Sequence, residues 1–111
     1  MNLSYNVLPQ SFQNMRPVAL ASEHAGLHSI AIADSPLISR ELFLSCAECL
    51  HETKSLNVMT AVTNPLTRHP SVAASAIATL CEMAPGASWS VSPRVIVRLG
   101  ELASVRLRSV Y

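Results

Sequence analysis

Polar side chains follow three apolar segments of the chain, at the point where each segment ends. Gln10 comes after the first segment, Asp34 and Ser35 after the second, and Thr63 with Asn64 after the third. Hydroxyl, amide and carboxylate groups orient ligands by hydrogen bonds, and a carboxylate can also take part in proton transfer. If the three segments are parallel strands, their polar ends meet at one edge of a sheet, where ligands of parallel α/β folds bind.

The same polar residues also have a purely structural interpretation. Asp34 stands two residues before Pro36 and can cap a helix that starts there. Thr63 and Asn64 are ordinary turn residues before Pro65. Taken without further information, helix capping is favoured for Asp34, and the turn interpretation is favoured for Thr63 and Asn64.

Cys46 and Cys49 have the spacing of a redox motif, with His51 nearby. Thioredoxin-type sites place such a pair at a helix N-terminus, where the pKa of the thiol is lowered. Here the pair falls inside an expected helix over residues 37–51 and on its apolar side, which favours core packing over a small thiol redox protein. No second ligand pair accompanies the cysteines, so the sequence predicts no metal site.

Three strand–helix alternations are expected to position these side chains. In chain order they are strand Leu3–Leu8, a helix from Met15 to Ala25, strand Ser29–Ala33, a helix over 37–51, strand Leu56–Val62 and a helix that opens at Pro70. Gly26 is expected at the C-terminus of the first helix. Strands separated by helices of about 10–15 residues imply parallel βαβ units with right-handed crossovers, so an α/β fold is predicted.

Composition restricts the class of protein. The chain has 111 residues, of which 50% are hydrophobic and 14% charged, which is typical of one small folded domain. A net charge of +1 favours neither nucleic acid nor a membrane surface as a partner. No apolar run reaches the roughly 18 residues of a membrane helix, no secretory signal is recognised, and the three cysteines are interpreted as reduced thiols, so a cytoplasmic location is expected.

The segments IAIADSP and TAVTNPLTRHP, with the helices between and after them, resemble the bacterial-luciferase-like oxidoreductase family. The similarity covers about residues 1–86 and is greatest to the subgroup of methylene-tetrahydromethanopterin reductases, which use coenzyme F420. It implies the N-terminal part of a TIM (β/α)8 barrel, present here as three βα units. It also implies hydride transfer or monooxygenation of a small-molecule substrate through FMN or coenzyme F420.

The resemblance implies which residues would bind the cofactor: Asp34, Ala61, Val62, Thr63 and Asn64. In family members that use F420, a non-prolyl cis peptide bond at the end of the third strand lies against the ring, and the matching bond is Ala61–Val62. Such a bond costs about 3–4 kcal/mol and persists only where its surroundings enforce it. Several relatives have a histidine directly after the position of Asp34, where this chain has Ser35, so no catalytic residue is assigned.

The residues after Gly86 differ from the rest. Up to Gly86 there are four Lys/Arg and six Asp/Glu, and from Ala87 onward four Arg and one Glu. Relatives continue with a fourth strand and a phosphate-holding loop that resembles Gly-x-Gly-x-Gly-Asp-Ser-Ala. In a shifted frame, permitted codons across Ser88–Arg98 spell Ile-Val-Val-Gly-Ile-Ala-Thr-Gly-Asp-Ser-Ala, close to that loop.

We therefore divide the chain into a partial luciferase-like barrel domain, 1–86, and an atypical tail, 87–111, hypothesised to be an off-frame product. An uninterrupted gene frame with no family loop in the neighbouring frame would refute this hypothesis. A complete barrel has eight units and about 250 residues, so three units are expected to be inactive alone. The open sheet edge is expected to promote association into homo-oligomers, with Val95–Leu99 as a candidate fourth strand. A non-enzymatic remnant is the alternative.

Overall fold

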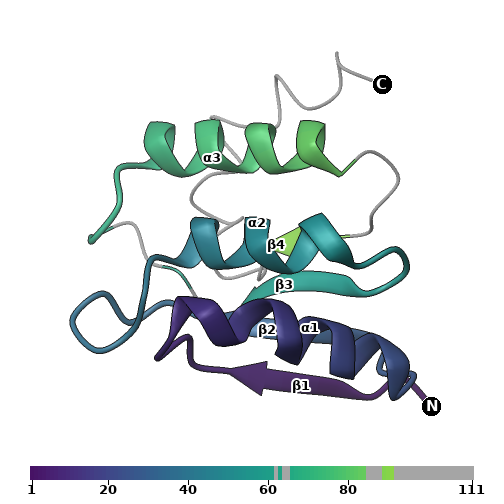
Figure 1. Cartoon of the computed structure of the whole chain (residues 1–111). Helices are drawn as coiled ribbons and strands as arrows, with labels where there is room; N and C mark the ends of the chain where they lie inside the picture. Colours follow the sequence, from purple (N-terminus) through teal and green to yellow (C-terminus); the bar gives the residue numbers. More distant parts are fainter. Residues whose placement is uncertain (62, 64–65, 85–88, 92–111) are drawn as a thin grey trace.

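The structure is a computed structural model, and it describes residues 1–61, 63, 66–84 and 89–91. A sheet of four parallel strands lies at its centre, and the strands follow one another in chain order (Figure 1). The strands are β1 (Ser4–Val7), β2 (Ser29–Ala33), β3 (Asn57–Ala61) and β4 (Trp89–Val91). The helices are the short 3-10 helix η1 (Phe12–Asn14), α1 (Met15–His24), α2 (Leu42–Glu52) and α3 (Pro70–Met83).

The α-helices form a second layer on the sheet. α2 packs against both α1 and α3, and α1 and α2 also contact the strands (Figure 1). Since the strands follow one another in chain order, right-handed crossovers place successive helices on the same face. The parallel βαβ units that the sequence predicts are therefore confirmed.

Among the three strands whose burial is described, β2 is the most deeply buried, as its apolar composition predicts. Ile30 and Ile32 are fully buried, and the register places them beside Val58 and Thr60 of β3. Alternate residues of a strand share a face, so these four side chains point toward the helices. Burial of each large aliphatic side chain contributes about 2 kcal/mol to stability.

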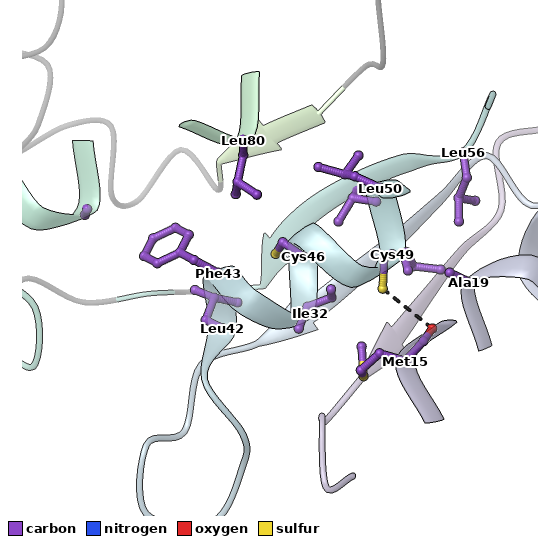
Figure 2. Packing of buried hydrophobic residues seen from close by; sticks show 13 residues of the cluster. Met15, Ala19, Ile32, Leu42, Phe43, Cys46, Cys49, Leu50, Leu56 and Leu80 are labelled. Carbon is purple, nitrogen blue, oxygen red and sulfur yellow. Dashed lines mark hydrogen bonds between the residues drawn. The ribbon is translucent and has the colours of Figure 1, made fainter. Parts of the chain in front are cut away.

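Helix α2 supplies the largest share of the core. The buried apolar residues of this helix are shown in Figure 2: Leu42, Phe43, Cys46, Cys49 and Leu50. The helix begins at Leu42, however, and not near residue 37. Residues before it form a closed loop, because Ser39 Oγ donates to Ser35 O at 2.9 Å and accepts from Ser35 N at 3.2 Å. Glu41 then caps the helix by accepting from Leu44 N.

Helix α3 begins at Pro70, as predicted, and only some of its apolar residues are buried. Val72 is 59% exposed, whereas Ala73 and Leu80 are buried and Ile77 packs against the core. Ala73 and Leu80 are seven residues apart, which places them on one side of an α-helix. Val72 precedes Ala73 and is therefore rotated about 100° away from that side.

Gly26 and the strand beside β3 can also be compared with what the sequence predicts. Gly26 has a φ of 74°, which confirms the expected left-handed residue after α1. The strand beside β3 is Trp89–Val91. The candidate strand Val95–Leu99 lies outside the described residues. Residues 92–111 lie outside the described residues, so the off-frame origin of the tail remains a hypothesis.

Candidate functional site

The ends of β2 and β3 bring together two of the residues that the sequence singles out. The register pairs Ala33 with Ala61, so both strands end at the same edge of the sheet. Asp34 follows β2 directly, and its side chain is only 1% exposed. Thr63 comes shortly after β3 and is 3% exposed. This edge is the place where ligands of parallel α/β folds bind.

Arg68, from the loop between β3 and α3, pairs with Asp34. Its Nε donates to Oδ2 and its Nη2 donates to Oδ1, each at 3.1 Å. The two parallel bonds are the bidentate geometry that arginine and carboxylate form best. The hydrogen bonds that Arg68 donates to Asp34 raise the pKa of Arg68 above its ordinary value, and the charges of Asp34 and Glu41 add to this effect.

Glu41 and Phe43 complete the surroundings of Arg68. Nη1 of Arg68 donates to Oε1 of Glu41, while Oε2 of Glu41 accepts from Leu44 N and caps α2. The guanidinium carbon lies 5.1 Å from the centre of the Phe43 ring, within the range of a cation–π contact. The guanidinium is thus held by two carboxylates and one aromatic ring.

The contacts of Asp34 also test whether this residue caps the helix that follows it. The cap of α2 is Glu41, so the expectation that Asp34 caps the following helix is wrong. Pro36 does not start the helix, because the loop from Ser35 to Ser39 closes on itself first. Both carboxylate oxygens of Asp34 are instead bonded to Arg68, and the carboxylate is almost entirely shielded from solvent.

Thr63 carries a buried hydroxyl to which no described residue offers a hydrogen bond. Its Oγ1 has no hydrogen-bond partner among the described residues. A buried hydroxyl without a partner costs about 1–3 kcal/mol, so it marks a place where a ligand atom would be favourable. Ala61, at the end of β3, is partly buried. Val62, Asn64 and with them the peptide bond Ala61–Val62 lie outside the described residues, so the expected cis bond remains a prediction.

The two helical cysteines are core residues, as the sequence favours. Cys46 and Cys49 are fully buried, and Cys49 Sγ lies 3.7 Å from Met15 O (Figure 2). Burial raises the pKa of Cys49 to about 12 and also raises the pKa of Cys46. Since the thiolate is the reactive form, this environment opposes thiol redox chemistry.

Two other functional features are not found in the described part of the chain. There, no three His, Cys, Asp or Glu side chains are grouped as a metal ion would require. Nor does any helix of residues 1–61, 66–84 reach the length and hydropathy that crossing a membrane requires. His69, which precedes Pro70, caps α3, because its Nδ1 accepts from Ser71 N.

Sequence reasoning missed Arg68, Glu41 and Phe43 as parts of one site. Arg68 stands alone in a loop, and no periodicity relates it to Asp34, 34 residues earlier. The motif TRHP contained it, but the motif served only for recognition of the family. A lone arginine in one loop and two carboxylates in the loop after the preceding strand are a signal that could have raised the question, although spacing along the chain could not have answered it.

Comparison with known proteins agrees with the fold. The family model of the luciferase-like monooxygenases matches residues 2–87. Comparison with curated proteins finds no significant match. Among solved structures, the chain is similar to the coenzyme F420 dependent tetrahydromethanopterin reductase from Methanopyrus kandleri, with 21% identity and a TM-score of 0.73 over 89% of this chain and 30% of that chain.

The chain thus spans about 30% of the length of that structure. At this identity the likeness shows the fold, an open α/β unit that corresponds to a fragment of a TIM barrel. The family match, in contrast, covers most of the chain and includes the ends of β2 and β3 together with Arg68. The protein therefore belongs to the luciferase-like monooxygenase family.

Proposed function

We propose that this chain supplies the first βα units of a luciferase-like oxidoreductase, and that the ends of β2 and β3 hold the ring of FMN or coenzyme F420. One observation carries the proposal: a buried Asp34–Arg68 pair and the unsatisfied hydroxyl of Thr63 lie at one edge of a parallel sheet, inside the segment that matches the family. The substrate would be a small molecule. The F420-dependent reductase to which the chain is similar supports F420 as one candidate cofactor.

The residues at this edge fit a flat ring. Ala61 has a small side chain that leaves room at the end of β3, and Thr63 offers a hydroxyl that the described residues do not use. We therefore assign ring contact to Ala61 and Thr63, and include Val62 and Asn64 in the proposal. A bound flavin or deazaflavin ring supplies hydride transfer, and a flavin also supplies reaction with oxygen.

The role of the remaining residues follows from their contacts. Asp34 was expected at the ring, but its two oxygens are bonded to Arg68, so it contributes by holding that residue. Asp34 therefore offers no lone carboxylate for proton transfer, and no other proton donor is assigned. The residues of this chain would bind and orient the ring and shield one side of it from water.

Titration of the full chain with FMN and with coenzyme F420 tests the proposal. Each ring is fluorescent, so a saturable change in intensity or anisotropy is expected with at least one of them. The cofactor with the lower dissociation constant identifies the preferred ring. Fluorescence that stays unchanged for both cofactors at high protein concentration would contradict the proposal and favour a non-enzymatic remnant.

A small thiol redox protein, the other candidate function, is supported by no observation. Its two cysteines are fully buried and have raised thiol pKa values.

A further inference from the structure

The charge balance around Arg68 argues against a role of its side chain in binding an anionic ligand. Among the described residues, Asp34 accepts from two of its five N–H donors and Glu41 accepts from a third, and the side chain is only 17% exposed. Two carboxylates outweigh one guanidinium, so the group as a whole is negative. Such a group does not attract an anionic ligand, and the arrangement therefore calls for another role for Arg68.

Polar links connect the loops that follow the first three strands. Arg40 N, after β2, donates to Pro9 O, after β1, at 2.7 Å. The neighbouring residue Glu41 accepts from Arg68, which belongs to the loop after β3. The links therefore run in a row along the edge of the sheet, and Arg68 makes the connection between the second and third loops.

Hydrophobic burial contributes little to holding the described residues of these two loops in place. Leu37, in the loop after β2, is 100% exposed, and Leu66, in the loop after β3, is 94% exposed. Ile38, the next apolar residue, is 67% exposed. Because these apolar side chains contribute little to packing, the position of the loops must depend largely on their polar contacts.

We propose that Arg68 is a positioning residue, which holds the loops after β2 and β3 in one arrangement and thereby fixes the ends of these strands beside Thr63. Asp34 acts through Arg68 and does not touch the ligand. The planar guanidinium is suited to this task, because it binds Asp34 with two nitrogens, reaches Glu41 with the third and stacks on Phe43. Only the consequence for ring binding rests on the proposed function.

Hydrogen exchange of backbone amides tests the inference without a ligand. The variants are Arg68→Lys, which keeps the charge but not the planar fork, and Arg68→Met, which keeps much of the apolar stem. The amides of Ser39 and Arg40, which bond to Ser35 O and Pro9 O, report on the loop after β2, and the amides of β2 report on global stability. Arg16→Met is the matched control, since Arg16 also joins two acidic residues, Glu48 at 2.9 Å and Glu52 at 3.3 Å.

We expect exchange at Ser39 and Arg40 to be about tenfold faster in both Arg68 variants, while the β2 amides change by less than about twofold. The control is expected to leave Ser39 and Arg40 unchanged. The inference is overturned if Ser39 and Arg40 keep their protection in Arg68→Met, or if all amides accelerate by one factor. It is also overturned if Arg68→Lys behaves as the original chain, because charge alone would then suffice.

A second measurement concerns the ring site and separates the two proposals. If the unmodified chain binds FMN or coenzyme F420, the dissociation constant of Arg68→Lys is expected to be about tenfold higher, and that of Arg16→Met unchanged. Equal affinity in Arg68→Lys would overturn the link between Arg68 and the ring site. If the unmodified chain binds neither cofactor, the proposed function fails, while the exchange comparison still decides the role of Arg68.

Discussion

The carboxylate of Glu23, near the end of α1, accepts a hydrogen bond of 2.6 Å from the backbone N–H of Ser55, just before β3. The same oxygen, Oε1, also accepts from Lys54 N at 2.7 Å and from Leu56 N at 3.2 Å. These contacts lie at the opposite edge of the sheet from Asp34 and Arg68. In βα barrels that edge serves stability, whereas the edge with Arg68 serves binding. The two clusters therefore give different predictions.

Removal of the Glu23 charge is expected to lower the acid sensitivity of the fold. The backbone hydrogen bonds from Ser55 and Lys54 lower the pKa of Glu23 below 4.5 in the folded chain. As pH falls below about 4.5, the unfolded chain takes up a proton that the folded chain does not, so this stabilisation is lost. Glu23→Gln should lower the free energy of unfolding at pH 7 and show a shallower loss of stability below about pH 4.5, measured by urea unfolding at several pH values.

Glu82→Gln, which changes an exposed carboxylate of α3, is the control for Glu23. Its unfolding free energy is expected to follow the original chain at every pH. If the free energy of unfolding of Glu23→Gln falls below pH 4.5 as steeply as that of the original chain, the contacts with Ser55 and Lys54 do not contribute to stability.

Substitution of Asp34 by Asn is expected to destabilise the chain by about 2 kcal/mol, as measured by urea unfolding at pH 7. The change removes the charged partner of a largely buried guanidinium, although Glu41 and Phe43 remain in contact with it. Glu48→Gln is the matched control, since Glu48 pairs with an Arg16 side chain that is 45% exposed, and a loss below about 0.5 kcal/mol is expected. Equal losses in the two variants would contradict the importance of the buried pair.

Thr63→Val should separate stability from ligand binding. The hydroxyl has no partner among the described residues, so its loss is expected to leave stability unchanged or raise it by up to about 1 kcal/mol. Binding of FMN or F420 should become about tenfold weaker, because the proposed hydrogen bond to the ring is lost.

The same substitution at Thr53 provides the comparison. Thr53 Oγ1 donates to Cys49 O at 2.8 Å, so Thr53→Val should lower stability by about 1 kcal/mol and leave ring binding unchanged. A loss of stability in Thr63→Val that equals the loss in Thr53→Val would show that the Thr63 hydroxyl is already satisfied in the folded chain.

The cysteines are expected to react with a thiol reagent in a fixed order. Cys81 is partly exposed, whereas Cys46 and Cys49 are buried and have raised pKa values. Alkylation of the folded chain at pH 8, followed by peptide mass spectrometry, should label Cys81 first and the other two only after unfolding in urea. Labelling of Cys46 before Cys81 would contradict this expectation and support the alternative function as a small thiol redox protein.

The amino-acid sequence by itself determined the elements with strong local signals. The run Ser29–Ala33 is a buried strand because its small and branched apolar residues suit a strand covered on both faces. Pro70 starts α3 because proline fits the first turn of a helix and disrupts its interior. The helical spacing of Leu42, Cys46 and Cys49 likewise predicted their burial.

Only the tertiary structure decided the rest. The start of α2 depends on hydrogen bonds between Ser35 and Ser39, which compete with helix formation and which composition does not reveal. The exposure of Val72 depends on which side of α3 faces the sheet. The role of Asp34 depends on Arg68, a residue 34 positions away that the crossover brings to the same edge. Local propensity acts over a few residues, whereas an ion pair between two loops exists only after the strands have paired.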